Sequence, residues 1–471
     1  MKKATYLLMN LFSLIAINAY CQFDNPKLPL KVSADGRYLQ FQNGKPFFWM
    51  GDTGWELFHR LDKKEADFYL ETRARQGYNV IQAVVLPELG GLTVPNRNGD
   101  LPFINKNIHQ PNEKYFVFID SVINKAASLG MFVALLPSWG DAWSYKPWGD
   151  KQNIFDTANC YTYGKFIGNR YKHSWNVIWV LGGDRNPENE TQYKIIRALV
   201  KGIKETDGGN HLFTYHPGGS CSSASFFHQD KWLDFNMVQS GHGDRNGATY
   251  LYTLNNYILS PAKPCLDGEP RYEDIPVKFW EIKLDEKYKN NPYPIADSLT
   301  PYGYFNELDI RKAAYWSVFS GACGHTYGNG SVWGFWQPGR YSPIAVKHSW
   351  QTAMASPGGI QMGHLRKLIE QFGVNNLRPD RNVVTNNSFS GENYMAALRT
   401  KDGSAVLVYS PDGKKFSISL TKLSKRNIFA RWYNPRDGVY TAIMDMDTTK
   451  LICEFTPPSE GIDWVLIINK K

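Results

Sequence analysis

The sequence predicts an α/β fold: a (β/α)8 TIM barrel followed by a small antiparallel β-sandwich. Between residues 47 and 327, eight short apolar runs alternate with helical patterns. The runs lack polar alternation, which is typical of strands buried on both faces of a parallel sheet. Eight such units in succession favour a barrel, although an open doubly wound sheet is the alternative because periodicity alone does not close a barrel. After residue 378, short strands separated by turns predict the sandwich.

The first 21 residues have the pattern of a secretion signal. Two lysines precede an apolar run over residues 6–17, and Ala19-Tyr20-Cys21 ends the segment. The run is too short to cross a bilayer as a permanent helix. We therefore predict a signal peptide at residues 1–21, a secreted or periplasmic location and no membrane span. The alternative is a lipoprotein anchored through Cys21.

Composition narrows the class of protein. The chain has 471 residues, of which 14% are aromatic and 21% charged, so a folded globular protein is expected. The net charge of +9 is spread without basic blocks, which favours a solvated surface over a nucleic-acid site. The cysteines are widely spaced, with no Cys-x-x-Cys, and no metalloprotease, P-loop, esterase or dinucleotide motif is present. We expect no metal and no cofactor.

The predicted barrel domain spans residues 22–377 and begins with a β-hairpin over residues 30–48, which contain two Asx-Gly turn signals. Asp62 and Glu65 have the spacing of a capping box, and the helix that they open is expected to stop at Gly77. The eight strands are predicted at residues 47–50, 80–86, 131–136, 177–181, 212–215, 235–238, 264–266 and 324–327. Further helices are predicted at residues 112–129, 157–171, 192–206, 248–260, 310–320 and around 365–372.

The predicted sandwich spans residues 378–471. Its turns are marked by Asp-Gly and Pro-Pro pairs, and no long linker separates it from the barrel, so the two domains are expected to pack directly on each other. Its strands are predicted at residues 394–398, 405–409, 416–420, 428–432, 451–455 and 464–468.

Two acids stand out because each follows a predicted buried strand and lies in a turn. Asp184 ends Val180-Leu181-Gly182-Gly183-Asp184, and Glu269 lies in Asp267-Gly268-Glu269-Pro270. Active sites of such barrels lie at the carboxyl ends of the strands. Glycosidic bond hydrolysis needs two carboxyl groups, one to protonate the leaving oxygen and one to attack the sugar or activate water. We therefore predict a glycoside hydrolase with Asp184 as acid/base and Glu269 as nucleophile, acting on a poly- or oligosaccharide.

The sequence also allows a purely structural role for each acid. Asp184 fits a cap or turn residue before the next helix, and Glu269 could pair with Arg271 or Arg185. A carboxyl separation of about 5 to 5.5 Å predicts retention of configuration, and about 6.5 to 9.5 Å predicts inversion. We expect retention.

Other polar and aromatic residues near the strand ends are candidate substrate-binding groups, the tryptophans by stacking on sugar rings. Packing of a loop against the core is the alternative for each aromatic residue, and a satisfied structural role is the alternative for each histidine. The candidates are Asp52, Trp55, Glu88, Trp139, Asp141, Trp143, His216, Gln239, His242, His325, Trp333 and Trp336.

Several stretches resemble glycoside hydrolase family 140, the apiosidase-like family. They are Gly44-Lys45-Pro46-Phe47-Phe48-Trp49-Met50-Gly51-Asp52-Thr53-Gly54-Trp55-Glu56-Leu57-Phe58, Val180-Leu181-Gly182-Gly183-Asp184 and His325-Thr326-Tyr327-Gly328. The tail, with Trp432-Tyr433-Asn434-Pro435-Arg436-Asp437-Gly438, is similar to a domain labelled collagen-binding, although nothing in its sequence argues for collagen.

This resemblance implies a (β/α)8 barrel with an Asp acid and a Glu nucleophile, which match Asp184 and Glu269. It also implies apiosidase activity on the pectin rhamnogalacturonan II, as in gut Bacteroides-type bacteria. The alternatives are an endoglucanase-like or other barrel glycosidase of different specificity, and a non-catalytic carbohydrate-binding protein.

Overall fold

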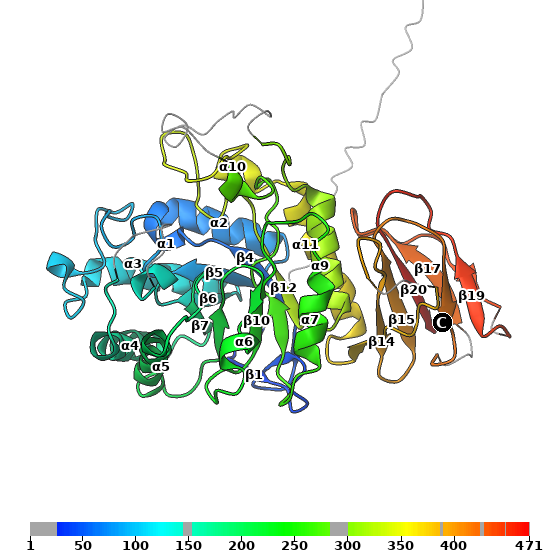
Figure 1. Ribbon diagram of the computed structural model, residues 1–471, viewed down its shortest axis with the longest axis horizontal. Helices are drawn as coiled ribbons and strands as arrows, with labels where there is room; N and C mark the ends of the chain where they lie inside the picture. The colour runs from blue at the N-terminus through cyan, green and yellow to red at the C-terminus, as the bar shows by residue number, and fades with distance from the viewer. Residues whose placement is uncertain are drawn as a thin grey trace, which may run out of the picture.

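A computed structural model describes residues 26–144, 153–282, 300–386, 390–423, 428–447 and 449–470. The predicted signal peptide, including Cys21, lies outside these residues. Figure 1 shows a larger domain of strands surrounded by helices and, beside it, a smaller domain made of strands. Within the described residues, no helix is both long enough and apolar enough to cross a bilayer.

Eight parallel strands form the barrel, as predicted. They are β4 (Trp49–Thr53), β5 (Val80–Val84), β6 (Phe132–Leu136), β7 (Val177–Gly182), β8 (Phe213–His216), β10 (Asn236–Gln239), β11 (Cys265–Asp267) and β12 (Gly324–Tyr327). The sheet order is β8-β7-β6-β5-β4-β12-β11-β10-β9, in which the short β9 (Cys221–Ser222) runs antiparallel to β10.

The two ends of this sheet meet between β8 and β10. The backbone N–H of Asp234 donates to the carbonyl of Phe213 at 2.9 Å. The hydroxyl of Thr214 donates to the carbonyl of Phe235 at 2.7 Å. These bonds join β8 to the two residues that lead into β10, so the eight parallel strands close into a barrel and the alternative of an open sheet is wrong.

Helices cover the barrel. The capping box is confirmed, because Asp62 accepts from the backbone of Glu65 and the Glu65 side chain accepts from the backbone of Asp62. Three short helices, α1 (Leu57–Arg60), α6 (Ala224–Phe227) and α10 (Trp350–Ala353), were not expected. The helices are α1 (Leu57–Arg60), α2 (Lys63–Arg75), α3 (Glu113–Ser128), α4 (Thr157–Tyr171), α5 (Glu190–Lys204), α6 (Ala224–Phe227), α7 (Thr249–Tyr257), α9 (Glu307–Phe319), α10 (Trp350–Ala353) and α11 (Pro357–Phe372), with 3-10 turns at Ile104–Lys106, Gly140–Ala142 and Phe279–Glu281.

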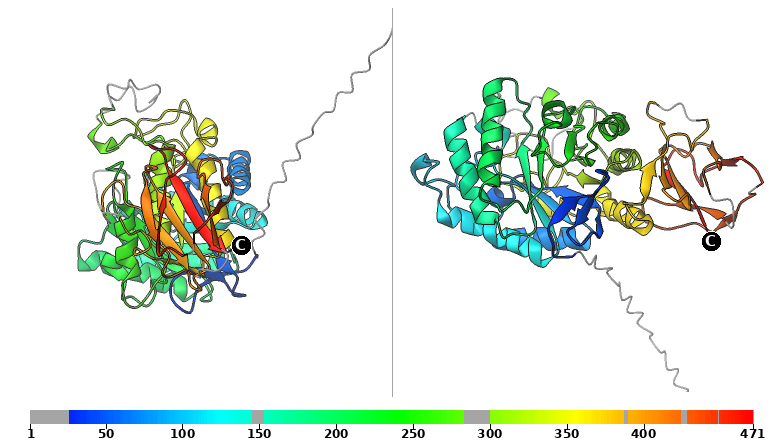
Figure 2. Two further views of the ribbon diagram at one scale, coloured as in Figure 1. Left: turned by 90° about the vertical axis from the view of Figure 1, so that its right-hand side faces the viewer. Right: turned by 90° about the horizontal axis from the view of Figure 1, so that it is seen from below.

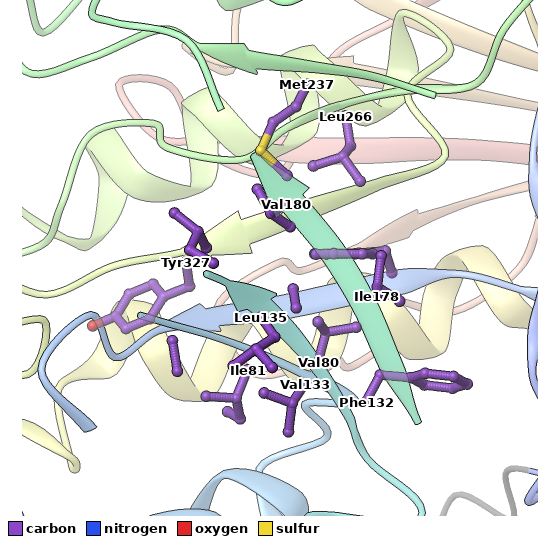
Figure 3. Packing of buried hydrophobic residues seen from close by; sticks show 14 of the residues in the cluster. Val80, Ile81, Phe132, Val133, Leu135, Ile178, Val180, Met237, Leu266 and Tyr327 are labelled. Atoms are coloured by element: carbon purple, nitrogen blue, oxygen red, sulfur yellow. The ribbon is translucent and has the colours of Figure 1, made fainter. Parts of the chain in front are cut away.

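The barrel core consists of the apolar runs that the sequence singles out. Val80, Phe132, Ile178 and Leu266 are each at most 1% exposed and pack among their neighbours in Figure 3. Full burial of one such side chain stabilises the fold by about 1.5 to 3 kcal/mol. The packed core therefore fixes the strands, and their ends provide a rigid base for a site.

A three-stranded antiparallel sheet lies at the amino ends of the barrel strands. It consists of β1 (Leu30–Val32), β2 (Leu39–Phe41) and β3 (Pro46–Phe47). The ring of Phe47 packs edge-on against Phe41 and against Phe132, which begins β6, at centroid distances of 5.4 and 5.3 Å. Because this contact lies at the amino end of β6, the sheet leaves the carboxyl end of the barrel free.

The C-terminal domain has one large antiparallel sheet and one small one. The large sheet has the order β13-β14-β15-β20-β17-β18, and β16 pairs with β19 in a separate ribbon. Buried side chains from both, such as Ile418 and Val408, share a second hydrophobic core. The strands β13 and β18 were not predicted. The strands are β13 (Leu377–Pro379), β14 (Ala396–Thr400), β15 (Ala405–Ser410), β16 (Phe416–Ser419), β17 (Ile428–Tyr433), β18 (Met444–Asp445), β19 (Ile452–Phe455) and β20 (Trp464–Lys470).

The two domains pack directly on each other along α9, which lies on the side of the barrel that faces the C-terminal domain in Figure 1, and the right-hand view of Figure 2 shows the two domains side by side. Arg311 of α9 forms a bidentate ion pair with Asp463, with N···O distances of 2.8 and 2.9 Å. Tyr315 stacks on Tyr409 with ring centroids 4.8 Å apart. This buried contact makes the C-terminal domain a brace for the outer helices of the barrel.

Candidate active site

A cavity of about 410 Å³ lies at the carboxyl end of the barrel. Every one of the eight parallel strands contributes to its wall through the residues that follow it. In chain order of the strands, these wall residues include Trp55, Glu88, Trp139, Asp184, Ser220, His242, Glu269 and Trp333. The cavity therefore lies over the centre of the barrel end, where residues from all eight strands meet.

The segment after β7 bends sharply and directs Asp184 to this cavity. Gly182, Gly183 and Asp184 have φ angles of +93°, +96° and +53°, a conformation that costs a residue with a Cβ about 1 kcal/mol or more. A Cβ on Gly183 would lie 2.8 Å from the Trp139 ring. Glycine is therefore required here for close packing, and the strain at Asp184 is stored where the side chain enters the cavity.

Glu269 is held by three side chains. Its Oε1 accepts from the Tyr272 hydroxyl at 2.8 Å and lies 3.3 Å from Nε2 of His242. Its Oε2 lies 3.0 Å from Nε2 of His216. Burial raises the pKa of Glu269, but hydrogen bonds from the two histidines outweigh burial and bring the pKa below its usual range. Glu269 is therefore ionised at neutral pH.

The protonation of the His216 ring follows from its two neighbours. The backbone N–H of Asp184 donates to Nδ1 of His216 at 3.3 Å, so that nitrogen must be an acceptor. The proton of a neutral ring then lies on Nε2, where it faces Glu269. His216 thereby links the backbone of one predicted catalytic residue to the carboxylate of the other.

The Asp184 carboxyl is in a different environment. Its side chain is 33% exposed, and Oδ2 lies 2.8 Å from Nη1 of Arg185. Burial and the negative charge of Glu269 raise its pKa, and together they exceed the lowering effects of Arg185 and of a hydrogen bond from Gln239. The two carboxyl groups on one cavity wall therefore have pKa values shifted in opposite directions.

Glu88 is a third carboxyl group on the cavity wall. Burial, followed by the negative charges of Asp184 and Asp141, raises its pKa well above the usual value. Asp141 itself forms an ion pair with Arg185 behind the cavity. The shift favours the neutral form of Glu88, which can donate an O–H hydrogen bond to a sugar hydroxyl.

The structure brings Trp55, Glu88, Trp139, Gln239, His242 and Trp333 to the cavity with the two predicted catalytic acids, and His216 lies directly behind Glu269.

Five other predicted binding residues do not line the cavity. Asp52 is buried in an ion pair with Arg73, and Asp141 pairs with Arg185. His325 is enclosed in the barrel, where burial lowers its pKa to about 3. Trp143 and Trp336 are buried beside the cavity rather than in its wall.

The contacts of the two acids differ from the purely structural roles considered for them. Glu269 pairs with neither arginine: Arg271 donates to the backbone carbonyls of Asp244 and Gly247, and Arg185 pairs with Asp184 and Asp141. Asp184 does not cap α5, whose N-cap residue is Asn189.

Sequence reasoning missed several cavity residues. Tyr272 bonds directly to Glu269, and its own hydroxyl accepts from Nε1 of Trp55 at 3.2 Å. Its position three residues after Glu269 was the available signal. The other missed residues are Gly219, Ser220, Gly241, Gly243, Ile275, Phe279, Trp280 and Ile344. Within the part of the chain that the structure describes, no three His, Cys, Asp or Glu side chains gather as a set of metal ligands.

Two solved structures share both sequence and fold with the chain. One, named only as a glycoside hydrolase, is 31% identical with a TM-score of 0.80 and covers 94% of this chain and 97% of its own. The other, a glycoside hydrolase family 5 protein from Bacteroides vulgatus, is 31% identical with a TM-score of 0.81 over 94% of each chain. Together with the carboxyl pair in the pocket, these likenesses define the protein as a glycoside hydrolase.

The chain belongs to the family described as "Apiosidase-like, catalytic domain", whose sequence model matches residues 33–376. Residues 378–469 match the model described as "Putative collagen-binding domain of a collagenase". A family 5 mannosidase from Rhizomucor miehei, at 14% identity and a TM-score of 0.52 over 73% of this chain and 99% of its own, shows the fold alone. Among curated proteins, no match is found.

Proposed function

We propose that the protein is a secreted apiosidase that releases an apiosyl residue from a side chain of the pectin rhamnogalacturonan II. The observation that carries the proposal is the pair of carboxyl groups, Asp184 and Glu269, on the wall of one pocket with pKa values shifted in opposite directions. Membership of the apiosidase-like family supports the choice of sugar.

In the first step, Asp184 is the acid. Its raised pKa favours the protonated carboxyl, whose proton moves to the glycosidic oxygen as the bond to the anomeric carbon breaks. Ionised Glu269 attacks that carbon from the other side and forms a glycosyl ester. The donors His216, His242 and Tyr272 hold the carboxylate in place before the attack.

In the second step, Asp184 acts as a base. It takes a proton from water, and the resulting hydroxide equivalent attacks the anomeric carbon and displaces Glu269 as a carboxylate. Both carboxyl groups return to their starting forms, and the released sugar keeps its anomeric configuration. Glu88 lies in the pocket wall, and its raised pKa favours the neutral form, which can donate a hydrogen bond to a hydroxyl of the bound sugar.

The substrate is tested by incubating the purified protein with rhamnogalacturonan II side-chain oligosaccharides and with mannan, cellulose and pectin backbone fragments. Mass spectrometry of the products is expected to show loss of one pentose from the side-chain oligosaccharides only. Proton NMR of the first product formed is expected to show the substrate's anomeric configuration. Cleavage of mannan or cellulose instead would contradict the assignment of substrate, and an inverted product would contradict the ester.

Secretion is tested at the N-terminus of the protein expressed in a Gram-negative host. Cleavage of the predicted signal after Cys21 leaves a chain that begins at Gln22 and is found in a soluble periplasmic or extracellular fraction. Mass analysis that finds a lipid on Cys21 would instead support the anchored alternative.

A further inference from the structure

Trp280 lies at the mouth of the pocket. It is part of the cavity wall, yet 56% of its surface is exposed, whereas the other tryptophans of the wall are at most 6% exposed. The buried tryptophans Trp55 and Trp139 pack against the ring of His216 next to Glu269. The wall therefore has buried aromatic rings near the carboxylate and one exposed ring farther out.

The exposure of Trp280 does not result from a loose backbone. The segment that carries it is fixed at two points: the N–H of Lys278 donates to the carbonyl of His242 at 3.0 Å, and the N–H of Val277 donates to the carbonyl of Gly303 at 2.9 Å. Phe279, its neighbour, packs against the His242 ring with centroids 5.8 Å apart. The fold thus anchors this loop to the residue that contacts Glu269 and leaves the Trp280 ring uncovered.

The Trp280 ring lies close to Gly243 on the loop after β10. A Cβ on Gly243 would lie 3.4 Å from Cη2 of Trp280, which is ordinary van der Waals contact, so the ring edge lies directly over this glycine. The indole is therefore supported on one edge by the loop after β10. A ring held in this way loses little freedom when a ligand stacks on its face.

We propose that Trp280 is the stacking platform for the leaving group. The leaving group is the sugar unit on the other side of the glycosidic bond from the sugar that Glu269 attacks. The cleaved sugar lies beside Glu269, among the buried rings of Trp55 and Trp139. The next sugar then lies at the mouth, where the apolar face of a pyranose ring can stack on the exposed indole. The inference rests on the proposed glycosidase function and extends it to recognition of the leaving group.

The platform is tested with two substrates that share the terminal sugar. One is a methyl glycoside, whose leaving group is too small to stack, and the other is a disaccharide with a sugar leaving group. For Trp280→Ala, kcat/KM on the disaccharide is expected to fall roughly three- to tenfold, the worth of one stacked ring, with no change on the methyl glycoside. Trp280→Phe is expected to recover most of the loss.

Phe68→Ala is the matched control, because Phe68 is an exposed aromatic residue on α2 that does not line the cavity. This variant is expected to change kcat/KM on neither the disaccharide nor the methyl glycoside. Equal losses by Trp280→Ala on both substrates would show that the ring only supports the loop, and no loss on the disaccharide would show that nothing stacks there; either result overturns the proposal. If wild-type protein cleaves no apioside, the proposed substrate is wrong, and the same pair of substrates built on the sugar that it does release tests the platform independently.

Discussion

Nε2 of His216 lies 3.0 Å from Oε2 of Glu269, while Nδ1 of the same ring accepts the backbone N–H of Asp184. One imidazole therefore sets the position of the loop after β7 relative to the carboxylate after β11. The arrangement requires the Nε2–H form of the ring, and that form stabilises the ionised state of Glu269.

Replacement of His216 by Phe removes the donor to Glu269 and keeps most of the ring's volume. The pKa of Glu269 is then expected to rise, because one of the hydrogen bonds that lower it is gone. Since Glu269 must be ionised to attack, the acid limb of the kcat/KM profile is expected to move to higher pH. His211→Phe is the control: His211 is a buried histidine that precedes β8, at the amino end of the barrel, and its loss should leave that limb in place. An unmoved limb in His216→Phe would contradict the role assigned to His216.

The pH dependence of the wild-type enzyme follows from the two shifted carboxyl groups. Activity is expected to rise as Glu269 ionises, at a pH below that of an ordinary glutamate, and to fall as Asp184 loses its proton, at a pH above that of an ordinary aspartate. In Asp184→Asn, the falling limb should disappear from the residual activity. A falling limb that persists unchanged in this variant would assign it to another group.

The strand-to-loop turn at Gly183 is expected to tolerate no side chain. Alanine there would meet the Trp139 ring at 2.8 Å and would have to adopt a φ of +96°, so the backbone that carries Asp184 must shift. Displacement of a catalytic group by about 1 Å costs roughly a hundredfold in rate, and a loss of this order in kcat is expected for Gly183→Ala. Gly334→Ala, where the new Cβ finds only ordinary contacts at 3.7 Å or more, is the control. Comparable activity in both variants would argue against a strained turn as the positioning device.

The ion pair between Arg311 and Asp463 is expected to contribute measurably to stability. Both side chains are buried, with exposures of 2% and 0%, so Arg311→Met leaves a buried carboxylate with Arg436 as its remaining cation. Loss of about 3 kcal/mol of unfolding free energy is expected, the lower part of the range for a broken buried pair. Lys63→Met breaks an exposed pair with Asp67 and should cost less than about 1 kcal/mol. Urea denaturation of the two variants compares them; equal midpoints would mean that the domain contact is held by apolar packing alone.

The strands and most long helices could be predicted because their signals are local. Apolar runs such as residues 132–136 are buried on both faces, and side chains within a few residues, such as Asp62 and Glu65, determine a helix start. The rule that active sites of such barrels lie at the carboxyl ends of the strands singled out Asp184 and Glu269, and both lie on the cavity wall.

The same rule did not distinguish which side chains of a strand end face the pocket. Successive side chains alternate between the two faces of a strand, so Asp52 turns to Arg73 and Tyr69 on α2 instead of the cavity. Trp280 was missed because a loop of more than ten residues separates it from β11, and its return to the cavity depends on backbone bonds to His242 and Gly303. Contacts of that range leave no pattern in the local sequence.

Catalysis by this mechanism needs both carboxyl groups. The most direct test is to measure turnover by Asp184→Asn and Glu269→Gln on the substrate that the wild type cleaves. Each variant should keep the wild-type circular dichroism spectrum and lose at least about a hundred- to ten-thousandfold in kcat/KM, because proton transfer or covalent attack is removed while the pocket stays intact. Near-wild-type turnover by either folded variant would contradict the mechanism.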